Sequence, residues 1–141
     1  MNILIIEDNG YKYKDIKEAL NKIFINPVIN WEKSKTSGLY AIEKHNFKTS
    51  GLIPYDLIIC DNYLPIFDDE RTLKECALDI INEIKENYEL NNLKIIVCSA
   101  GNLEPNNYDF FIQYDSNILL DEEFLKILQK MNDIKRKTLK K

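Results

Sequence analysis

The sequence lacks several features that mark large functional classes. Asp and Glu (23) outnumber Lys and Arg (19), and the formal net charge is −4. A protein that binds nucleic acid needs a basic face for the phosphates, and this balance does not provide one. The N-terminus is apolar for only four residues before Glu7, too short for a signal peptide, and no stretch approaches the length of a membrane span. We therefore expect a cytoplasmic protein that binds neither nucleic acid nor membrane.

Cysteine and histidine are also scarce. The three cysteines, Cys60, Cys76 and Cys98, show no CxxC spacing, and two of them lie inside apolar runs. We interpret them as reduced thiols that pack as small hydrophobic residues, as is common in the cytosol. The one histidine, His45, lies in a polar segment that is typical of an exposed helix end.

Short apolar runs alternate with helical patterns along the chain. Three runs rich in Ile or Val lack polar alternation, as do central strands of a parallel sheet. They are Asn2 to Ile6, Leu57 to Cys60 and Leu93 to Cys98. Two more polar strand candidates, expected nearer an edge, are Pro27 to Trp31 and Phe110 to Tyr114. Helical spacing is found from Ile16 to Phe24 behind a capping Asp15, from Ser37 to Ile42, from Thr72 to Tyr88, and behind Asp121.

This alternation predicts a doubly wound α/β fold. Its five parallel strands, in the order 2-1-3-4-5, would be joined by right-handed crossovers with helices on both faces. Only ten residues separate Ser99 from Phe110, and Gly101 and Pro105 disfavour a helix among them. We therefore expect the fourth helix to be short or absent. Residues 1–141 would form one domain with no attached effector.

Acidic residues directly follow the expected strands. Glu7 and Asp8 end the first strand, Asp61 ends the third, and Ser99 ends the fourth. The carboxyl ends of neighbouring parallel strands meet at one edge of such a sheet. Two carboxylates about 4 Å apart repel by about 4 kcal/mol at an effective dielectric of about 20, so the cluster must hold a cation, share a proton or remain in water. A site that offers only oxygen ligands and must also bind a phosphoryl group favours Mg²⁺. One Asp of the cluster could then act as a nucleophile toward phosphorus.

These residues resemble the receiver domains of two-component response regulators, the CheY-like group of the flavodoxin-like superfamily. The resemblance covers nearly the whole chain. It rests on Glu7-Asp8, on Asp61-Asn62-Tyr63-Leu64-Pro65 followed by Asp68, and on Ser99-Ala100. The middle segment is the most specific, because it is similar to the family's phosphoacceptor segment.

The resemblance implies a role for each site residue. Asp61 would accept a phosphoryl group from a sensor histidine kinase or a phosphotransfer protein. Mg²⁺ would be held by Glu7, Asp8 and Asp61 with the backbone carbonyl of Tyr63. Ser99 would supply the hydroxyl that reorients toward the phosphorylated aspartate.

The sequence departs from the family at the fifth strand. Receivers place a lysine there, whereas this chain reads Gln113-Tyr114, and either residue could take the position. Gln113 could replace the lysine as a hydrogen-bond donor, but a neutral bond is roughly half as strong as a charge-assisted one. The family's loop glycine is replaced by Asp69, and its switch aromatic would be Phe110 or Phe111.

Two functions remain open. In the first, a stand-alone receiver-like domain accepts a phosphoryl group on Asp61 in an Mg²⁺-dependent reaction and thereby controls binding to an output partner or to a second copy. In the second, a degenerate pseudo-receiver binds partners regardless of phosphorylation. Neither is an enzyme beyond self-phosphorylation and autodephosphorylation. A phosphohydrolase with an Asp nucleophile would need an acid where Tyr63 stands, and a flavin site would need a phosphate loop in place of Glu7-Asp8.

Overall fold

A computed structural model describes residues 1–46, 54–87, 93–100, 108–114 and 122–139. In this part of the chain the main sheet has five strands, all parallel, in the order β2-β1-β3-β6-β7. They are β1 (Asn2–Ile6), β2 (Val28–Glu32), β3 (Leu57–Cys60), β6 (Lys94–Ser99) and β7 (Phe110–Gln113). The predicted fold class and order 2-1-3-4-5 are confirmed, since β6 and β7 are the fourth and fifth strands of this sheet.

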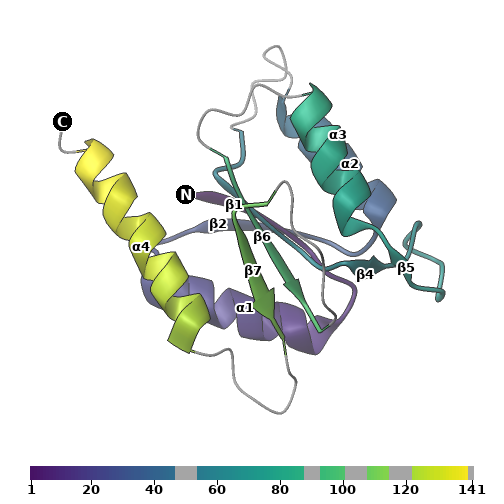
Figure 1. Cartoon of the computed structure of the whole chain (residues 1–141), viewed down its shortest axis with the longest axis horizontal. Helices are drawn as coiled ribbons and strands as arrows, with labels where there is room; N and C mark the ends of the chain where they lie inside the picture. Colours follow the sequence, from purple (N-terminus) through teal and green to yellow (C-terminus); the bar gives the residue numbers. More distant parts are fainter. Residues whose placement is uncertain (47–53, 88–92, 101–107, 115–121, 140–141) are drawn as a thin grey trace.

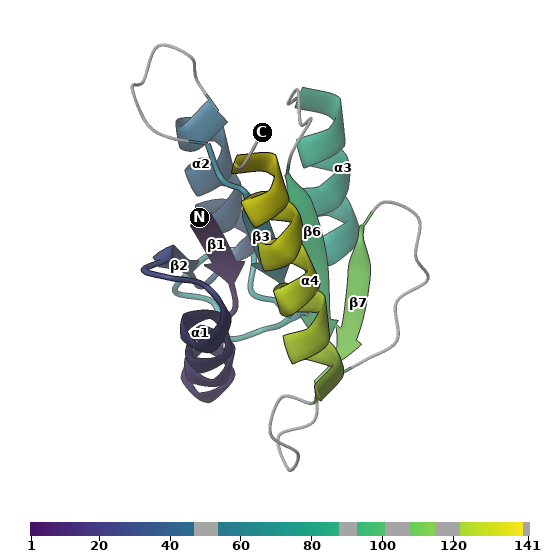
Figure 2. The same cartoon turned by 90° about the vertical axis from the view of Figure 1, so that its left-hand side faces the viewer.

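Helices cover both faces of the sheet. The helices α1 (Gly10–Ile23) and α4 (Glu122–Leu139) lie on one face, and α2 (Lys35–Asn46) and α3 (Ala77–Asn87) lie on the other (Figure 1). In Figure 2, α4 lies in front of the strands and α1 lies below them, seen nearly end-on, with α2 and α3 at the opposite side of the sheet. None of the described helices combines the length and apolar composition that would let it cross a membrane.

The strand side chains alternate between two hydrophobic cores. Ile3 and Ile5 of β1 pack with α1 and α4, whereas Leu4 and Ile6 pack with α2 and α3. All four side chains are fully buried, which explains why β1 shows no polar alternation in the sequence. The three cysteines are free thiols and are buried, as predicted.

The helix α1 begins earlier than the sequence pattern indicated. Its N-cap is Asn9, whose side-chain oxygen accepts hydrogen bonds from the backbone N–H groups of Tyr11 and Lys12 at 2.9 and 3.2 Å. Asp15 lies inside the helix, so the prediction that it begins or caps the first turn was wrong. An asparagine cap satisfies N–H groups that have no partner inside the helix, and this adds a full turn before Asp15.

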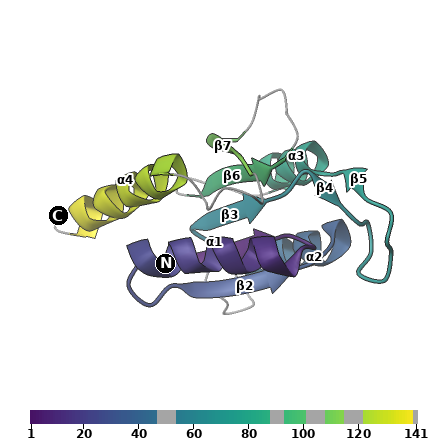
Figure 3. The same ribbon diagram turned by 90° about the horizontal axis from the view of Figure 1, so that it is seen from below.

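The helix α3 begins later than predicted, at Ala77. The segment before it pairs Lys74–Glu75 (β5) with Tyr63–Leu64 (β4) in a short antiparallel ladder. This hairpin projects beyond the carboxyl ends of the main strands (Figure 3). The buried Asn62 directs the chain into the helix, because its side-chain oxygen accepts a hydrogen bond from the N–H of Ala77 and its carbonyl accepts one from the N–H of Cys76. The prediction of helix from Thr72 onward was therefore wrong over its first residues.

The link between β6 and β7 shows no helix among its described residues. Most of the predicted short or absent helix falls on residues 101–107, which lie outside the described part of the chain.

Candidate functional site

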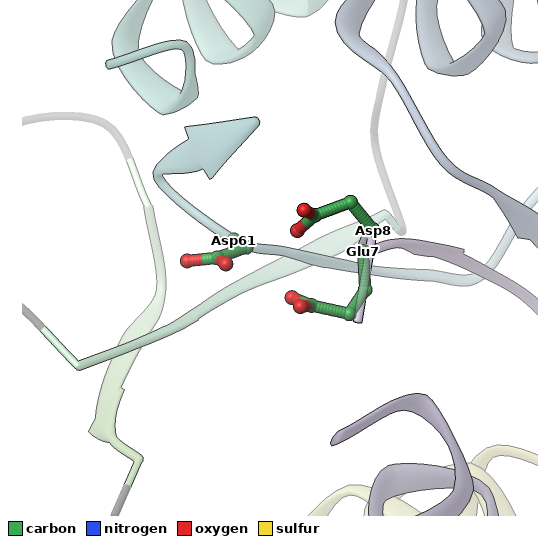
Figure 4. Close-up of side chains that lie close together, drawn as sticks. All are labelled: Glu7, Asp8 and Asp61. Atoms are coloured by element: carbon green, nitrogen blue, oxygen red, sulfur yellow. The ribbon is translucent and has the colours of Figure 1, made fainter. Parts of the chain in front are cut away.

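Three carboxyl groups meet at the carboxyl edge of the sheet. Glu7 and Asp8 follow β1, Asp61 follows β3, and one oxygen from each lies within 4.8 Å of the others. Figure 4 shows the Glu7 side chain on the side of α1 and the Asp8 side chain on the side of β4, with both directed toward Asp61. The predicted convergence therefore occurs, and the group could hold a divalent metal ion.

Backbone hydrogen bonds fix these residues relative to the sheet. The N–H of Glu7 donates to the carbonyl of Glu32 at 2.9 Å, and the N–H of Asp61 donates to the carbonyl of Ile6 at 3.0 Å. The indole N–H of Trp31 donates to the Glu7 carbonyl at 2.6 Å. Glu7 and Asp61 thus continue the parallel ladder by one residue beyond β1 and β3.

Lys12 of α1 enters this cluster, and the sequence interpretation did not include it. Its Nζ atom lies 3.2 Å from Oε2 of Glu7 and 3.3 Å from Oδ2 of Asp61. It also donates a hydrogen bond to the carbonyl oxygen of Cys98 at 2.5 Å. Lys12 is only 4% exposed, which is rare for a lysine and requires paired charges.

The position of Lys12 follows from the start of α1. The cap at Asn9 places Lys12 in the first turn, one turn before the buried Ile16 and two turns before the buried Ala19 and Leu20. Residues spaced by four lie on the same face of a helix. The signal that could have revealed Lys12 was this spacing to Ile16 behind an asparagine cap, but a lysine at such a position is ordinarily assigned to the surface.

The aromatic ring of Tyr114 covers the ammonium from the side of β7. Nζ of Lys12 lies 5.0 Å from the ring centroid, and the Tyr114 hydroxyl donates a hydrogen bond to Oδ2 of Asp15 at 3.0 Å. Burial, together with this bond to the Asp15 carboxylate, raises the pKa of Tyr114 to about 12, so its hydroxyl remains a donor at neutral pH. The ring shields the ammonium from water and adds a favourable cation–π contact.

The electrostatics of the cluster follow from its burial. Burial raises the pKa of Glu7 to about 8, an effect that Asp61 reinforces and Lys12 opposes. Burial alone would lower the pKa of Lys12, but the carboxylates of Glu7 and Asp61 outweigh it and the pKa is raised. The ammonium is therefore charged at neutral pH, whereas burial favours the protonated form of Glu7.

Two buried polar atoms at this edge have no hydrogen-bond partner among the described residues. They are the hydroxyl oxygen of Ser99, at the end of β6, and Oε2 of Glu7, which lies 3.2 Å from the Lys12 ammonium in an ion pair. Buried polar atoms are nearly always satisfied by protein, water or an ion. The Ser99 hydroxyl is therefore a polar group that a ligand or a water molecule at this edge could satisfy.

The remaining predicted site residues are placed less directly. Gln113 lies opposite Ser99 in the ladder between β6 and β7, and its proposed role in place of the family lysine remains a prediction. Tyr63 donates its backbone N–H to Oδ1 of Asp61 at 3.4 Å, and the metal contact of its carbonyl also remains a prediction. Asp68 and Asp69 are exposed in the loop between β4 and β5.

The architecture is that of response-regulator receiver domains, which recur among the solved structures similar to this chain. A two-component response regulator from Legionella pneumophila matches with a TM-score of 0.67 and 16% identity, over 94% of this chain and 98% of that one. The manganese-bound form of the response regulator Rcp1 matches with a TM-score of 0.64 and 17% identity, over 92% of this chain and 90% of that one. The phosphorylated cyanobacterial phytochrome response regulator RcpA matches equally well in TM-score, 0.64, at 18% identity over 94% and 91% of the two chains.

The resemblance to receiver domains is thus confirmed for the fold. No protein-family model matches the sequence, and no curated protein matches it.

Proposed function

We propose that this chain is a receiver-like signalling domain in which Asp61 accepts a phosphoryl group in an Mg²⁺-dependent reaction that controls partner binding. The observation that carries the proposal is the cluster of Glu7, Asp8 and Asp61 at the carboxyl edge of the sheet, where ligands of doubly wound folds bind. The similar structures support it, since one is a manganese-bound and another a phosphorylated response regulator.

The donor set suits a hard divalent cation. Glu7, Asp8 and Asp61 offer carboxylate oxygens, and the Tyr63 carbonyl would complete the set we propose for Mg²⁺. When bound, Mg²⁺ would offset negative charge on the phosphoryl oxygens. Burial raises the pKa of Glu7 and of Asp8, and a bound divalent cation would lower both, because it favours the charged carboxylates.

Asp61 would supply the nucleophile. One of its carboxylate oxygens attacks phosphorus and forms a new O–P bond, while the bond from phosphorus to the donor breaks and its electron pair leaves with the donor. The donor is a phosphohistidine of a sensor kinase or phosphotransfer protein, or a small acyl phosphate. Water later attacks phosphorus, releases inorganic phosphate and restores the Asp61 carboxylate.

Ser99 would couple phosphorylation of Asp61 to a conformational change. Its hydroxyl is fully buried and without a hydrogen-bond partner in the described part of the chain. A phosphoryl group on Asp61 would bring new acceptor oxygens to this edge, and a donor that turns toward them would move β6 and the chain after it. Such a change would control binding to an output protein or a second copy of the chain.

A second candidate function is that of a pseudo-receiver that binds partners without phosphorylation. The observation that favours it is the ion pairing of Lys12 with Glu7 and Asp61, which offsets part of the acidic charge with no metal. In a pseudo-receiver the acidic cluster would have no role in phosphoryl transfer, and its ion pairs with Lys12 would stabilise it.

Intact-mass spectrometry separates the two functions. The protein is incubated with Mg²⁺ and acetyl phosphate, and in parallel with Mg²⁺ and beryllofluoride while its amide spectrum is recorded. We expect wild-type protein to gain one phosphoryl group and to show shifted amide signals, and the Asp61→Asn variant to show neither. If wild type and Asp61→Asn give the same null result, phosphorylation is excluded and the pseudo-receiver function is favoured.

A further inference from the structure

We infer that Lys12 of α1 is the catalytic cation of the Asp61 site, and that it binds the phosphoryl oxygens once Asp61 is modified. The inference rests on the proposed function, because it assigns a residue to that same site. Its basis is the position of a buried ammonium 3.3 Å from Oδ2 of Asp61, the atom type that would attack phosphorus.

The ammonium occupies only one side of the acidic cluster. Lys12 contacts Glu7, which lies on the side of α1, while Asp8 points to the side of β4 (Figure 4). Asp61 lies across from both of them (Figure 4), and its Oδ1 atom accepts from the N–H of Tyr63 while its Oδ2 atom faces Lys12. The cluster therefore has a cationic half at Oδ2 and an acidic half at Oδ1 and Asp8, where a divalent cation would still find carboxylate ligands.

The ammonium is held rigidly in this half. The Cys98 carbonyl accepts its hydrogen bond, and the Tyr114 ring lies 5.0 Å away. Cys98 belongs to β6 and Tyr114 directly follows β7, so the cation is held by the edge of the sheet as well as by its own helix. A charge that is already in place and dehydrated stabilises new negative charge without a cost of reorganisation.

The charge balance also favours this role. Among the described residues Lys12 makes ion pairs with Glu7 and Asp61 and none with Asp8, so this one ammonium does not pair with all three carboxyl groups of the cluster. A phosphoryl group on Asp61 would add further negative charge next to the ammonium, and the N–H groups of Lys12 could donate to its oxygens. At the end of β7, where the family places its lysine, Gln113 and Tyr114 carry no positive charge. In the described part of the chain, the ion pairs of the acidic cluster are those that Lys12 makes with Glu7 and Asp61.

The test compares Lys12→Gln and Lys12→Arg with wild type, and uses Lys14→Gln as a control because Lys14 is exposed on the same helix. Two quantities are measured for each: the rate of Asp61 phosphorylation by acetyl phosphate with Mg²⁺, and Mg²⁺ affinity alone, followed by the fluorescence of Trp31. Trp31 is the only tryptophan of the chain, and its indole N–H bonds to the Glu7 carbonyl, so it reports on the cluster.

We expect Lys12→Gln to lower the phosphorylation rate at least about tenfold, the cost of losing a hydrogen bond from a charged donor, while Mg²⁺ binds as tightly as in wild type or more tightly. Lys12→Arg should keep much of the rate, and Lys14→Gln should equal wild type. Thermal unfolding shows whether each variant is folded. If Lys12→Gln is not folded, the double variant Lys12→Gln with Glu7→Gln, which also removes the carboxylate left unpaired, is compared with Glu7→Gln alone.

Three results would overturn the inference. If wild type and Lys12→Gln react equally fast, Lys12 has no part in the reaction although the proposed function stands. If Mg²⁺ binds to Lys12→Gln but not to wild type, the lysine takes the place of the metal. If wild-type Asp61 does not react at all, the inference fails together with the proposed function.

Discussion

At the scale of single residues, the main feature is a lysine enclosed by carboxyl groups. Lys12 and Glu7 are 4% and 2% exposed, so the charge of the ammonium, and that of Glu7 when it is ionised, is screened little by water. Removing one partner of such a buried pair leaves the other charge without compensation, which costs more than the pair itself contributes. Lys12 therefore affects the stability of the fold as well as the chemistry of the site.

We predict that Lys12→Met lowers the free energy of unfolding by about 3–5 kcal/mol, since it leaves Glu7 and Asp61 side by side without a cation. Adding Glu7→Gln should restore part of the loss, because it removes one of the two carboxyl groups. Urea unfolding of the two single variants and the double variant measures this coupling. Lys35→Met is the matched control, since the ion pair of Lys35 with Asp79 is exposed and should contribute less than about 1 kcal/mol. Additive effects of the Lys12 and Glu7 changes would contradict the ion pairing.

At the scale of secondary-structure elements, close packing fixes the helices against the sheet. In α2, Gly38 approaches β1 so closely that a Cβ atom there would lie 2.7 Å from Cδ1 of Ile6. Ile6 is fully buried on a central strand and cannot move far. The glycine is therefore required by this approach, although glycine is normally unfavourable inside a helix.

We predict that Gly38→Ala destabilises the protein by about 1–3 kcal/mol, because the new methyl group overlaps Ile6. This loss should outweigh the higher helix propensity of alanine. Ile6→Val removes the nearest atom, so Gly38→Ala should cost clearly less in that background. Thermal unfolding of the single and double variants gives the coupling. Thr36→Ala, at an exposed position of the same helix, serves as the control and should have little effect. A stabilising Gly38→Ala would show that α2 does not pack on β1 as described.

The strands and their order could be predicted because their apolar runs are uninterrupted and end in acidic residues. The short β4–β5 ladder could not be predicted, because Lys74 and Glu75 are exposed and polar, so the sequence shows no apolar run there that would indicate a strand. Leu73 matched the helical stripe of α3 by spacing alone, yet it is 48% exposed and precedes the helix. Periodicity does not distinguish such a residue from a core residue.

The acidic half of the site could be predicted and its cation could not. Glu7, Asp8 and Asp61 follow buried strands, so the geometry of a parallel sheet places them together. Lys12 reaches the same point from a helix, and only the exact start of that helix decides whether it faces the sheet or the solvent. That start depends on the cap at Asn9, a local hydrogen bond that the sequence pattern left unassigned.

At the scale of the whole molecule, one sheet edge collects groups from distant parts of the chain. Lys12 on α1 bonds to the Cys98 carbonyl of β6, 86 positions away, and Asp15 accepts a bond from Tyr114, 99 positions away. Charge that appears on Asp61 would therefore act on α1, β6 and β7 together. This connection gives a physical route from a modified aspartate to the surface near β7.

The measurement that tests the account most directly is the location of the phosphoryl group. Borohydride reduces an aspartyl phosphate to homoserine, which peptide mass spectrometry identifies at its position in the chain. After treatment with acetyl phosphate and Mg²⁺, we predict homoserine at position 61, and none when the metal is removed with a chelator. Unmodified Asp61 in the presence of Mg²⁺, or homoserine at Asp8 or Asp68 in its place, would contradict the assignment of Asp61 as the phosphoacceptor.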